Sequence, residues 1–137
     1  MAEGSFRLYQ SAQEKANFSD IASASLAMAL VKSAYTPASS HSLWSQVSGN
    51  EASYSATHIL SSVDWTVSGT ATKLTCANEN FTAAAGEITA QYAVVYSQPT
   101  GQLICIAELS TADVVANQIN LTLGTLFKCK DSSGMYS

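Results

Sequence analysis

A hydrophobic hairpin pattern over residues 87–109 constrains the fold of this chain more than any other stretch. It consists of two apolar runs, EITAQYAVVY (87–96) and QLICIAEL (102–109), joined by a short connection that contains Pro99 and Gly101. Runs of this length, rich in β-branched and aromatic residues on either side of a Pro/Gly connection, are typical of an antiparallel hairpin. We therefore predict two paired strands at the centre of the fold.

Both faces of this predicted hairpin are mostly apolar. Successive side chains of a strand point to opposite faces, so strict alternation predicts one face made of Ile88, Ala90, Tyr92, Val94 and Tyr96. In the second run, the same rule sets Leu103 and Cys105 opposite Ile104. A strand that is apolar on both faces is expected between two packed layers. The hairpin is thus predicted to belong to the core.

The remaining pattern predicts one mainly β domain over residues 1–137. Further strands are expected at 26–33, at 63–67 paired with 70–76, and at 118–127, where Gly124 marks a bulge or kink. Turn residues at 78–80 and a one-turn helix or bridging loop at 110–117 connect them, and a long loop covers 36–57. Short strands at close spacing indicate an antiparallel β-sandwich or a flattened barrel.

The two ends of the chain are expected to differ from this β domain. Helical spacing over residues 6–16 predicts one short N-terminal helix, which either caps an open end of the sheet or, as an arm within 1–17, docks on a partner. If the segment is an arm, deleting residues 1–17 should leave the domain folded. Residues 128–137 are predicted to be a polar C-terminal tail.

Charge and hydropathy exclude several classes of partner. Six Lys and Arg residues against ten Asp and Glu residues give a net charge of −4, whereas binding to phosphate backbones needs clustered cations. We therefore expect no nucleic-acid partner. The N-terminus lacks the pattern of a signal peptide, and no run is long and apolar enough to span a bilayer, so folding in a cytoplasm without a membrane partner is expected.

No catalytic, cofactor or metal motif stands out in the sequence. His41 and His58 are the available bases, but neither lies in a recognisable nucleophile or metal-binding motif, so both are predicted to be solvated loop residues. The acidic residues are scattered singly, unlike the ligands of a calcium loop. We predict a protein without catalytic residues, cofactor or metal. The three cysteines are predicted to be structural thiols: Cys76, Cys105 and Cys129.

The loop at 36–57 is the best candidate for a contact surface. Long loops in compact domains are commonly functional or held by their own side chains. Trp44 or Tyr54 could anchor a partner, because aromatic residues are enriched at binding hot spots. Alternatively, Trp44 packs inward with Val47 as a small satellite core.

Three segments share their order and spacing with a known family: MALVKSAYTP (28–37), WSQVSGNE (44–51) and ITAQYAVVY (88–96). In these segments the chain resembles small β-rich virion structural proteins of tailed bacteriophages, of the capsid decoration (cement) type. The resemblance runs from about residue 6 to residue 127. The chain departs from the family pattern at 53–56, where SYSA replaces a Gly-Tyr element and a Gly-Gly turn, and at its C-terminus, which extends past the last strand.

The resemblance implies a non-enzymatic protein that binds the outside of the major capsid protein lattice and stabilises the phage head. The expected partner is the phage major capsid protein, and a homo-oligomer of the chain itself is a second one. The expected location is the capsid surface of the virion, after synthesis in the bacterial host cytoplasm. The expected contact residues lie in the N-terminal segment and the loop: Phe6, Arg7, Tyr9, Tyr35, Pro37, His41, Trp44 and Tyr54.

Two other functions stay open at this point. The same kind of protein can be associated with a phage tail or fibre. A carbohydrate-binding β-sandwich is the alternative from another class, in which an exposed Trp44 with His41 and Asn50 nearby would form a sugar platform.

Overall fold

The computed structural model describes residues 6–9, 25–38, 40–55, 57–68, 71–110, 113–121 and 124–129. A five-stranded antiparallel sheet lies at its centre, in the order β1-β9-β8-β2-β3. Its strands are β1 (Arg7–Leu8), β2 (Leu26–Val31), β3 (His58–Ile59), β8 (Tyr92–Ser97) and β9 (Leu103–Glu108). The predicted strand at 26–33 is thus confirmed for most of its length, and it lies between β8 and β3.

The central hairpin predicted from the sequence is confirmed. β8 and β9 pair in antiparallel register, and the backbone N–H of Gly101 closes their connection on the carbonyl of Ser97 at 2.7 Å. Gly101 has a φ of 75°, in the left-handed region that glycine enters without a steric penalty. The Pro/Gly connection therefore forms the turn that the sequence indicates.

Strict alternation along the hairpin is wrong in two places. A bulge between Val95 and Tyr96 shifts the register, so that Ile104 and Cys105 both pack into one core cluster while Leu103 packs into the other. Ile88 and Ala90 also lie on the face opposite to the predicted one, because they belong to a separate strand, β7 (Ile88–Ala90). The chain changes its pairing partner at Gln91, between β7 and β8.

The second layer is a bent antiparallel ribbon. β10 (Val114–Ala116) pairs with β7, β11 (Gln118–Leu121) with β6 (Glu79–Thr82), and β12 (Gly124–Cys129) with β5 (Ala71–Cys76). Residues 83–87 lie between β6 and β7, whereas Asn117 alone separates β10 from β11, so one side of the ribbon is longer and the ribbon bends there. β4 (Asp64–Ser68) extends the ribbon beside β5, which confirms the hairpin predicted at 63–76.

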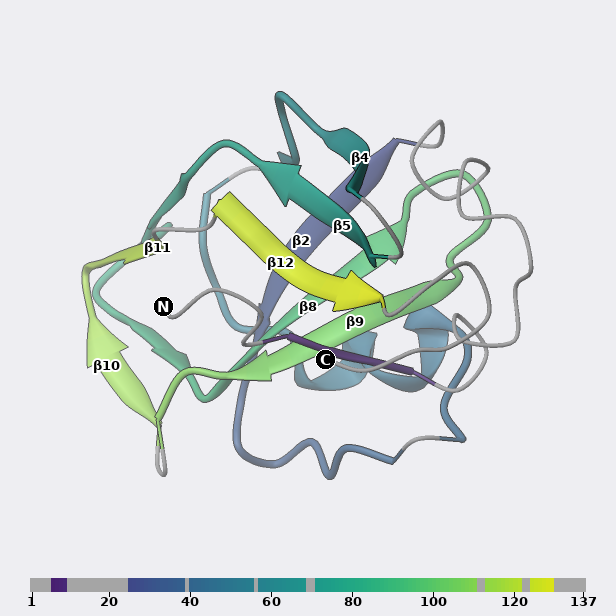
Figure 1. Cartoon of the computed structure of the whole chain (residues 1–137). Coiled ribbons are helices and arrows are strands. Elements are labelled where there is room, and N and C mark those ends of the chain that lie inside the picture. The colour runs from purple at the N-terminus through teal and green to yellow at the C-terminus, as the bar shows by residue number, and fades with distance from the viewer. Residues whose placement is uncertain are drawn as a thin grey trace.

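The central sheet is covered on both faces. In Figure 1, the teal strand β5 and the yellow strand β12 cross in front of the central strands β8 and β9. Between the sheet and the ribbon lies the larger core cluster, which includes Phe6, Met28, Phe81 and Ile104. The smaller cluster, with Tyr35, Val47 and Tyr96, lies on the opposite face of the sheet under the loop that follows β2.

The fold is therefore mainly β with packed antiparallel sheets, as predicted. The barrel alternative is not formed, because none of the sheets in the described residues closes on itself. The long loop is confirmed, and it contains two 3-10 turns, η1 (Trp44–Gln46) and η2 (Ser48–Asn50). Among the described residues, no helix is long and apolar enough to cross a membrane.

Several local predictions are wrong. Arg7 and Leu8 form a strand rather than the start of a helix, and residues 10–16 of the predicted helix lie outside the described residues. Glu79 and Asn80 open β6 instead of forming a turn, and residues 114–116 form β10 instead of a one-turn helix. In each case pairing across the sheet outweighed the local residue preference.

The predicted strand at 118–127 and the predicted C-terminal tail also differ in part from the structure. The strand at 118–127 is divided into β11 and β12, and a bulge lies at Thr125/Phe127, next to the predicted kink at Gly124. Lys128 and Cys129 belong to β12 rather than to a tail, and residues 130–137 lie outside the described residues.

Candidate functional site

The loop at 32–57 is held on the central sheet by backbone hydrogen bonds at both ends and in the middle. Lys32 N–H donates to the carbonyl of Asn50 at 2.9 Å, and Ala52 N–H donates to that of Leu30 at 2.8 Å. In the middle, Trp44 N–H donates to the carbonyl of Gly101 at 2.7 Å. The loop is therefore an ordered cover of the sheet, and in Figure 1 it starts as the blue segment after β2.

Trp44 packs inward, as one of the two alternatives predicted. Its indole stacks on the ring of Tyr96 with a centroid distance of 4.4 Å and an interplanar angle of 4°. Val47, three residues further on, is fully buried in the same cluster. One face of the indole is thus used within the protein, which leaves less of it for a sugar platform.

Tyr9, Tyr35 and His41 form a hydrogen-bonded row beneath the loop. The hydroxyls of Tyr9 and Tyr35 lie 3.0 Å apart, and the Tyr35 hydroxyl lies 2.8 Å from Nδ1 of His41. Burial raises the pKa of both phenols, and the bond to Tyr35 raises the pKa of Tyr9 further. The row links the N-terminal segment to the loop across the edge of the sheet.

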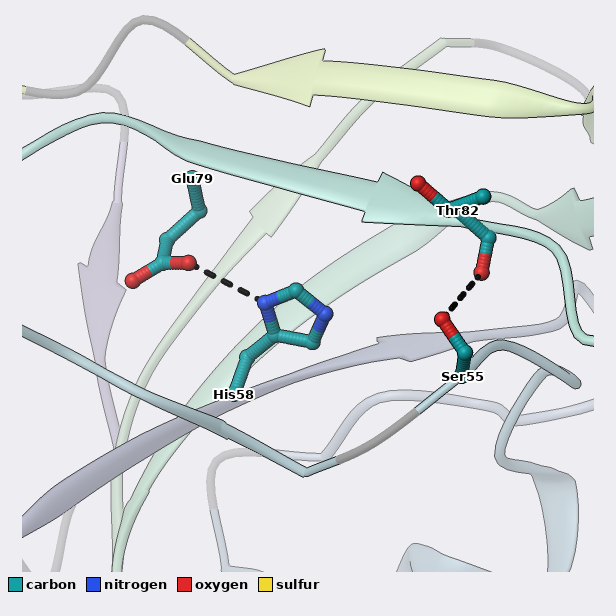
Figure 2. A network of polar contacts seen from close by, with 4 residues as sticks. All are labelled: Ser55, His58, Glu79 and Thr82. Carbon is teal, nitrogen blue, oxygen red and sulfur yellow. Dashed lines mark hydrogen bonds and ion pairs between the residues drawn. The ribbon is translucent and has the colours of Figure 1, made fainter.

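A second aromatic cluster lies where the loop ends. The rings of Tyr54 and His58 both pack on Phe81 of β6, with centroid distances of 5.0 Å and 3.9 Å. Nδ1 of His58 lies 3.1 Å from Oε2 of Glu79, and Ser55 donates both its N–H and its hydroxyl to the carbonyl of Thr82. Figure 2 shows the His58–Glu79 and Ser55–Thr82 contacts, which connect the end of the loop and β3 with β6.

The His58–Glu79 pair resembles the carboxylate–imidazole arrangement of a general base. A nucleophile would have to complete it, and the hydroxyl of Ser55, drawn beside the pair in Figure 2, is directed at Thr82 instead. The pair instead fastens the end of the loop to the second layer. Since its side chain is only 16% exposed and hydrogen-bonded to Glu79, the prediction of a solvated His58 is wrong. His41 is half-buried, and its bond to Tyr35 likewise contradicts the prediction.

A polar hollow of about 400 Å³ opens beside this cluster. It is lined by Glu51, Ala52, Ser53, Tyr54 and Thr57. The Tyr54 hydroxyl donates to the carboxylate of Glu51, and together with burial this bond raises the pKa of Tyr54. The hollow therefore presents one exposed carboxylate among hydroxyl groups.

The residues predicted to contact a partner fall into two groups. Phe6, Tyr9 and Tyr35 are 1%, 2% and 3% exposed, so their side chains are part of the interior and are corrected from surface to core. His41, Trp44 and Tyr54 are half-buried, and Pro37 is exposed. Arg7 lies in β1 at the edge of the sheet.

Exposed apolar residues that the sequence did not single out are Leu43, Ile59 and Val115. Leu43 is 48% exposed at the start of η1, and Val115 is 54% exposed on β10. Hydrophobic periodicity gives no signal for Leu43, because it lies in a loop where apolar residues follow neither the strand nor the helix spacing.

Two of the three cysteines predicted to be structural thiols have described side chains. Cys76 and Cys105 are buried and free, as expected for structural thiols, and burial raises the pKa of Cys76 to about 11. The side chain of Cys129 lies outside the described part. Among the residues described, no group of three or more His, Cys, Asp or Glu side chains could hold a metal ion.

The loop and the Tyr9–Tyr35–His41 row lie at the smaller core cluster, whereas Tyr54 and His58 pack on Phe81 at the larger one, beside the polar hollow. When this chain was compared with protein-family models, curated proteins and solved structures, none of them matched it.

Proposed function

We propose that this chain is a non-enzymatic structural protein of a tailed-phage virion, a capsid decoration protein that binds the outside of the major capsid protein lattice and stabilises the head. The chain would be made in the bacterial host cytoplasm and would act on the capsid surface. The proposal rests on the sequence resemblance, and the arrangement of the resembling segments supports it.

One observation carries the proposal. The three resembling segments, 28–37, 44–51 and 88–96, are far apart in sequence but pack as one unit. β2 pairs with β8 along six residues, Val31 forms a bridge with Glu51, and Trp44 stacks on Tyr96. Residues that resemble a family in separate stretches and then contact one another are expected of a shared structural unit, whereas chance matches would be scattered over the fold.

The outside of the loop is the surface we assign to the capsid. It carries Leu43, one of the most exposed large apolar residues described, and the exposed Pro37 belongs to the same loop. An exposed apolar side chain suits the centre of a small interface. Many copies on a repeated lattice would add such modest contacts into firm attachment.

Binding to capsids tests this assignment. Full-length protein is added to purified phage heads that lack it, and saturable binding at a fixed ratio to the major capsid protein is expected. Leu43→Asp should weaken binding by about tenfold or more, because it places a charge at the interface. Val115→Asp is the matched control, since Val115 is equally exposed but lies on the second layer, and it should bind as wild type does. Absence of saturable binding by the wild type would contradict the proposal.

Protein content of purified virions separates the head from the tail. A decoration protein is expected in hundreds of copies per particle, and a tail or fibre component in a handful. A low copy number would favour the tail alternative. The carbohydrate alternative is tested with the wild type on a glycan array, because substitution of Trp44 would also disturb the stack on Tyr96.

A further inference from the structure

The row formed by Tyr9, Tyr35 and His41 connects two segments that are distant in sequence. Tyr9 follows β1, while Tyr35 and His41 belong to the loop after β2. Both phenols are almost completely buried, and the imidazole is half-buried. Hydroxyls in such a place need a partner, because a buried donor without an acceptor is costly.

The direction of each hydrogen bond in the row follows from the bonds that Tyr35 already accepts. The Tyr9 hydroxyl is almost completely buried, and its partner among the described residues is the Tyr35 hydroxyl, so it satisfies its proton by donating to the Tyr35 oxygen. The backbone N–H of Ala38 donates to the same oxygen. The oxygen then has both acceptor positions filled, and its own proton is left for Nδ1 of His41. Nδ1 of His41 is then the acceptor of this bond, an arrangement that corresponds to the Nε2–H tautomer.

We propose that this row is a proton-gated latch that holds the N-terminal strand on the sheet. With His41 neutral, each hydroxyl donates once: Tyr9 to Tyr35, and Tyr35 to His41. When a proton binds Nδ1, His41 becomes a donor toward an oxygen that has no free acceptor position. The Tyr35 proton must then turn to Tyr9, and the Tyr9 hydroxyl loses its acceptor inside the protein.

The N-terminal strand is short enough for this loss to matter. β1 pairs with β9 through two residues only, Arg7 and Leu8, and one further bond runs from Tyr9 N–H to the carbonyl of Ile104 at 3.1 Å. Among the described side chains next to the strand, those of Phe6 and Tyr9 are buried. Binding of a proton at His41 therefore weakens one of the two side-chain anchors of β1, and a lower pH favours its release.

The titratable groups around the imidazole are phenols. The ring of Tyr35 lies 5.5 Å from that of His41, and Tyr92 of β8 meets Tyr35 edge-on at 6.1 Å. Lys32 at the start of the loop and Glu108, opposite Tyr92 in β9, are charged groups on the packed elements, and among the described side chains His41 forms no ion pair. The other described histidine, His58, is paired with Glu79 and lies beside the other core cluster.

Hydrogen exchange of the full-length protein tests the latch. The protection of the Tyr9 amide, corrected for intrinsic exchange, should fall by about tenfold between about pH 8 and about pH 5, the range in which histidine titrates. The Val94 amide in the centre of the sheet is the internal reference and should not change. In His41→Asn, whose amide oxygen can accept but cannot titrate, the change should disappear. In His58→Gln it should persist.

A second measurement on the wild type needs no variant to fold. Nitrogen chemical shifts of the histidine rings distinguish the two neutral tautomers, and His41 should be the Nε2–H form at neutral pH. Tyr35→Phe removes the donor and should abolish this preference. An Nδ1–H tautomer in the wild type, or a Tyr9 amide whose protection does not depend on pH, would overturn the latch. Neither result bears on capsid binding, so the latch and the proposed function can fail separately.

Discussion

The indole of Trp44 and the phenol ring of Tyr96 lie parallel, with their planes 4° apart and their centroids 4.4 Å apart. This stack joins the middle of the loop to the central sheet next to the point where Trp44 N–H bonds to Gly101. A tryptophan that would be read as a binding platform in the sequence is thus a structural contact in the fold. Substitutions at Trp44 and at Gly101 therefore test this attachment of the loop.

Trp44→Ala should lower the free energy of unfolding by about 2 kcal/mol. Large aromatic residues in full cores cost about 3–5 kcal/mol when truncated to alanine, and Trp44 is half-buried. Urea denaturation followed by tyrosine fluorescence or circular dichroism measures it. Trp44→Phe keeps a stacking ring and should recover most of the loss. An unchanged stability in Trp44→Ala would mean that the ring serves only an external partner.

Gly101→Ala should lower the free energy of unfolding by about 1–2 kcal/mol, because an L-residue is strained in the left-handed region. Gly49→Ala is the control, since Gly49 has no positive φ and open space around its Cα. It should change stability by less than about 0.5 kcal/mol. Thermal melts of the two variants side by side give the comparison. Equal losses in both would show that the turn at 98–101 relaxes to accept a side chain.

Removing residues 1–9 should destabilise the domain, in contrast to the expectation for a detachable arm. The deletion takes away β1 together with the buried side chains of Phe6 and Tyr9. Phe6→Ala alone should cost about 3 kcal/mol in the free energy of unfolding, whereas Pro37→Ala on the exposed loop should cost less than about 0.5 kcal/mol. Denaturation of the three variants measures this. A deletion that melts like the wild type would restore the arm.

Stability should decline at alkaline pH because of the buried thiols. Burial raises the pKa of Cys76 from 9.0 to about 11, and it raises the pKa of Cys105 as well. The unfolded chain therefore releases these protons first as the pH rises. The stabilising contribution of Cys76 is complete below pH 9.0 and is lost progressively up to about pH 11.

Urea unfolding at several pH values from neutral to alkaline checks this prediction. The slope of the free energy of unfolding against pH should be smaller in Cys76→Ala than in the wild type, whatever the loss at neutral pH. The same burial should keep Cys76 and Cys105 from reacting with a thiol reagent until the protein unfolds. Rapid labelling of either thiol in the folded state would contradict this protection by burial.

Residues whose role depends on local pattern were predicted well from the sequence. The runs around Val94 and Ile104 are apolar on both faces and became the paired strands of a doubly covered sheet. The loop at 36–57 lacks a period and became irregular structure with two short turns. The candidate site was predicted less well, because Phe6, Tyr9 and Tyr35 look like exposed anchors in sequence and are interior in the fold.

The sequence by itself determined that this chain has a mainly β fold with a central hairpin, because alternation and turn residues act over a few neighbouring positions. Only the tertiary structure decided which segments meet: that β7 leaves the central sheet at Gln91 to pair with β10, that a bulge puts Ile104 and Cys105 on one face, and that Tyr35 and His41 lie within hydrogen-bond distance. Pairings between distant segments depend on register, burial and the supply of hydrogen-bond partners, and none of these is a property of a local stretch of residues.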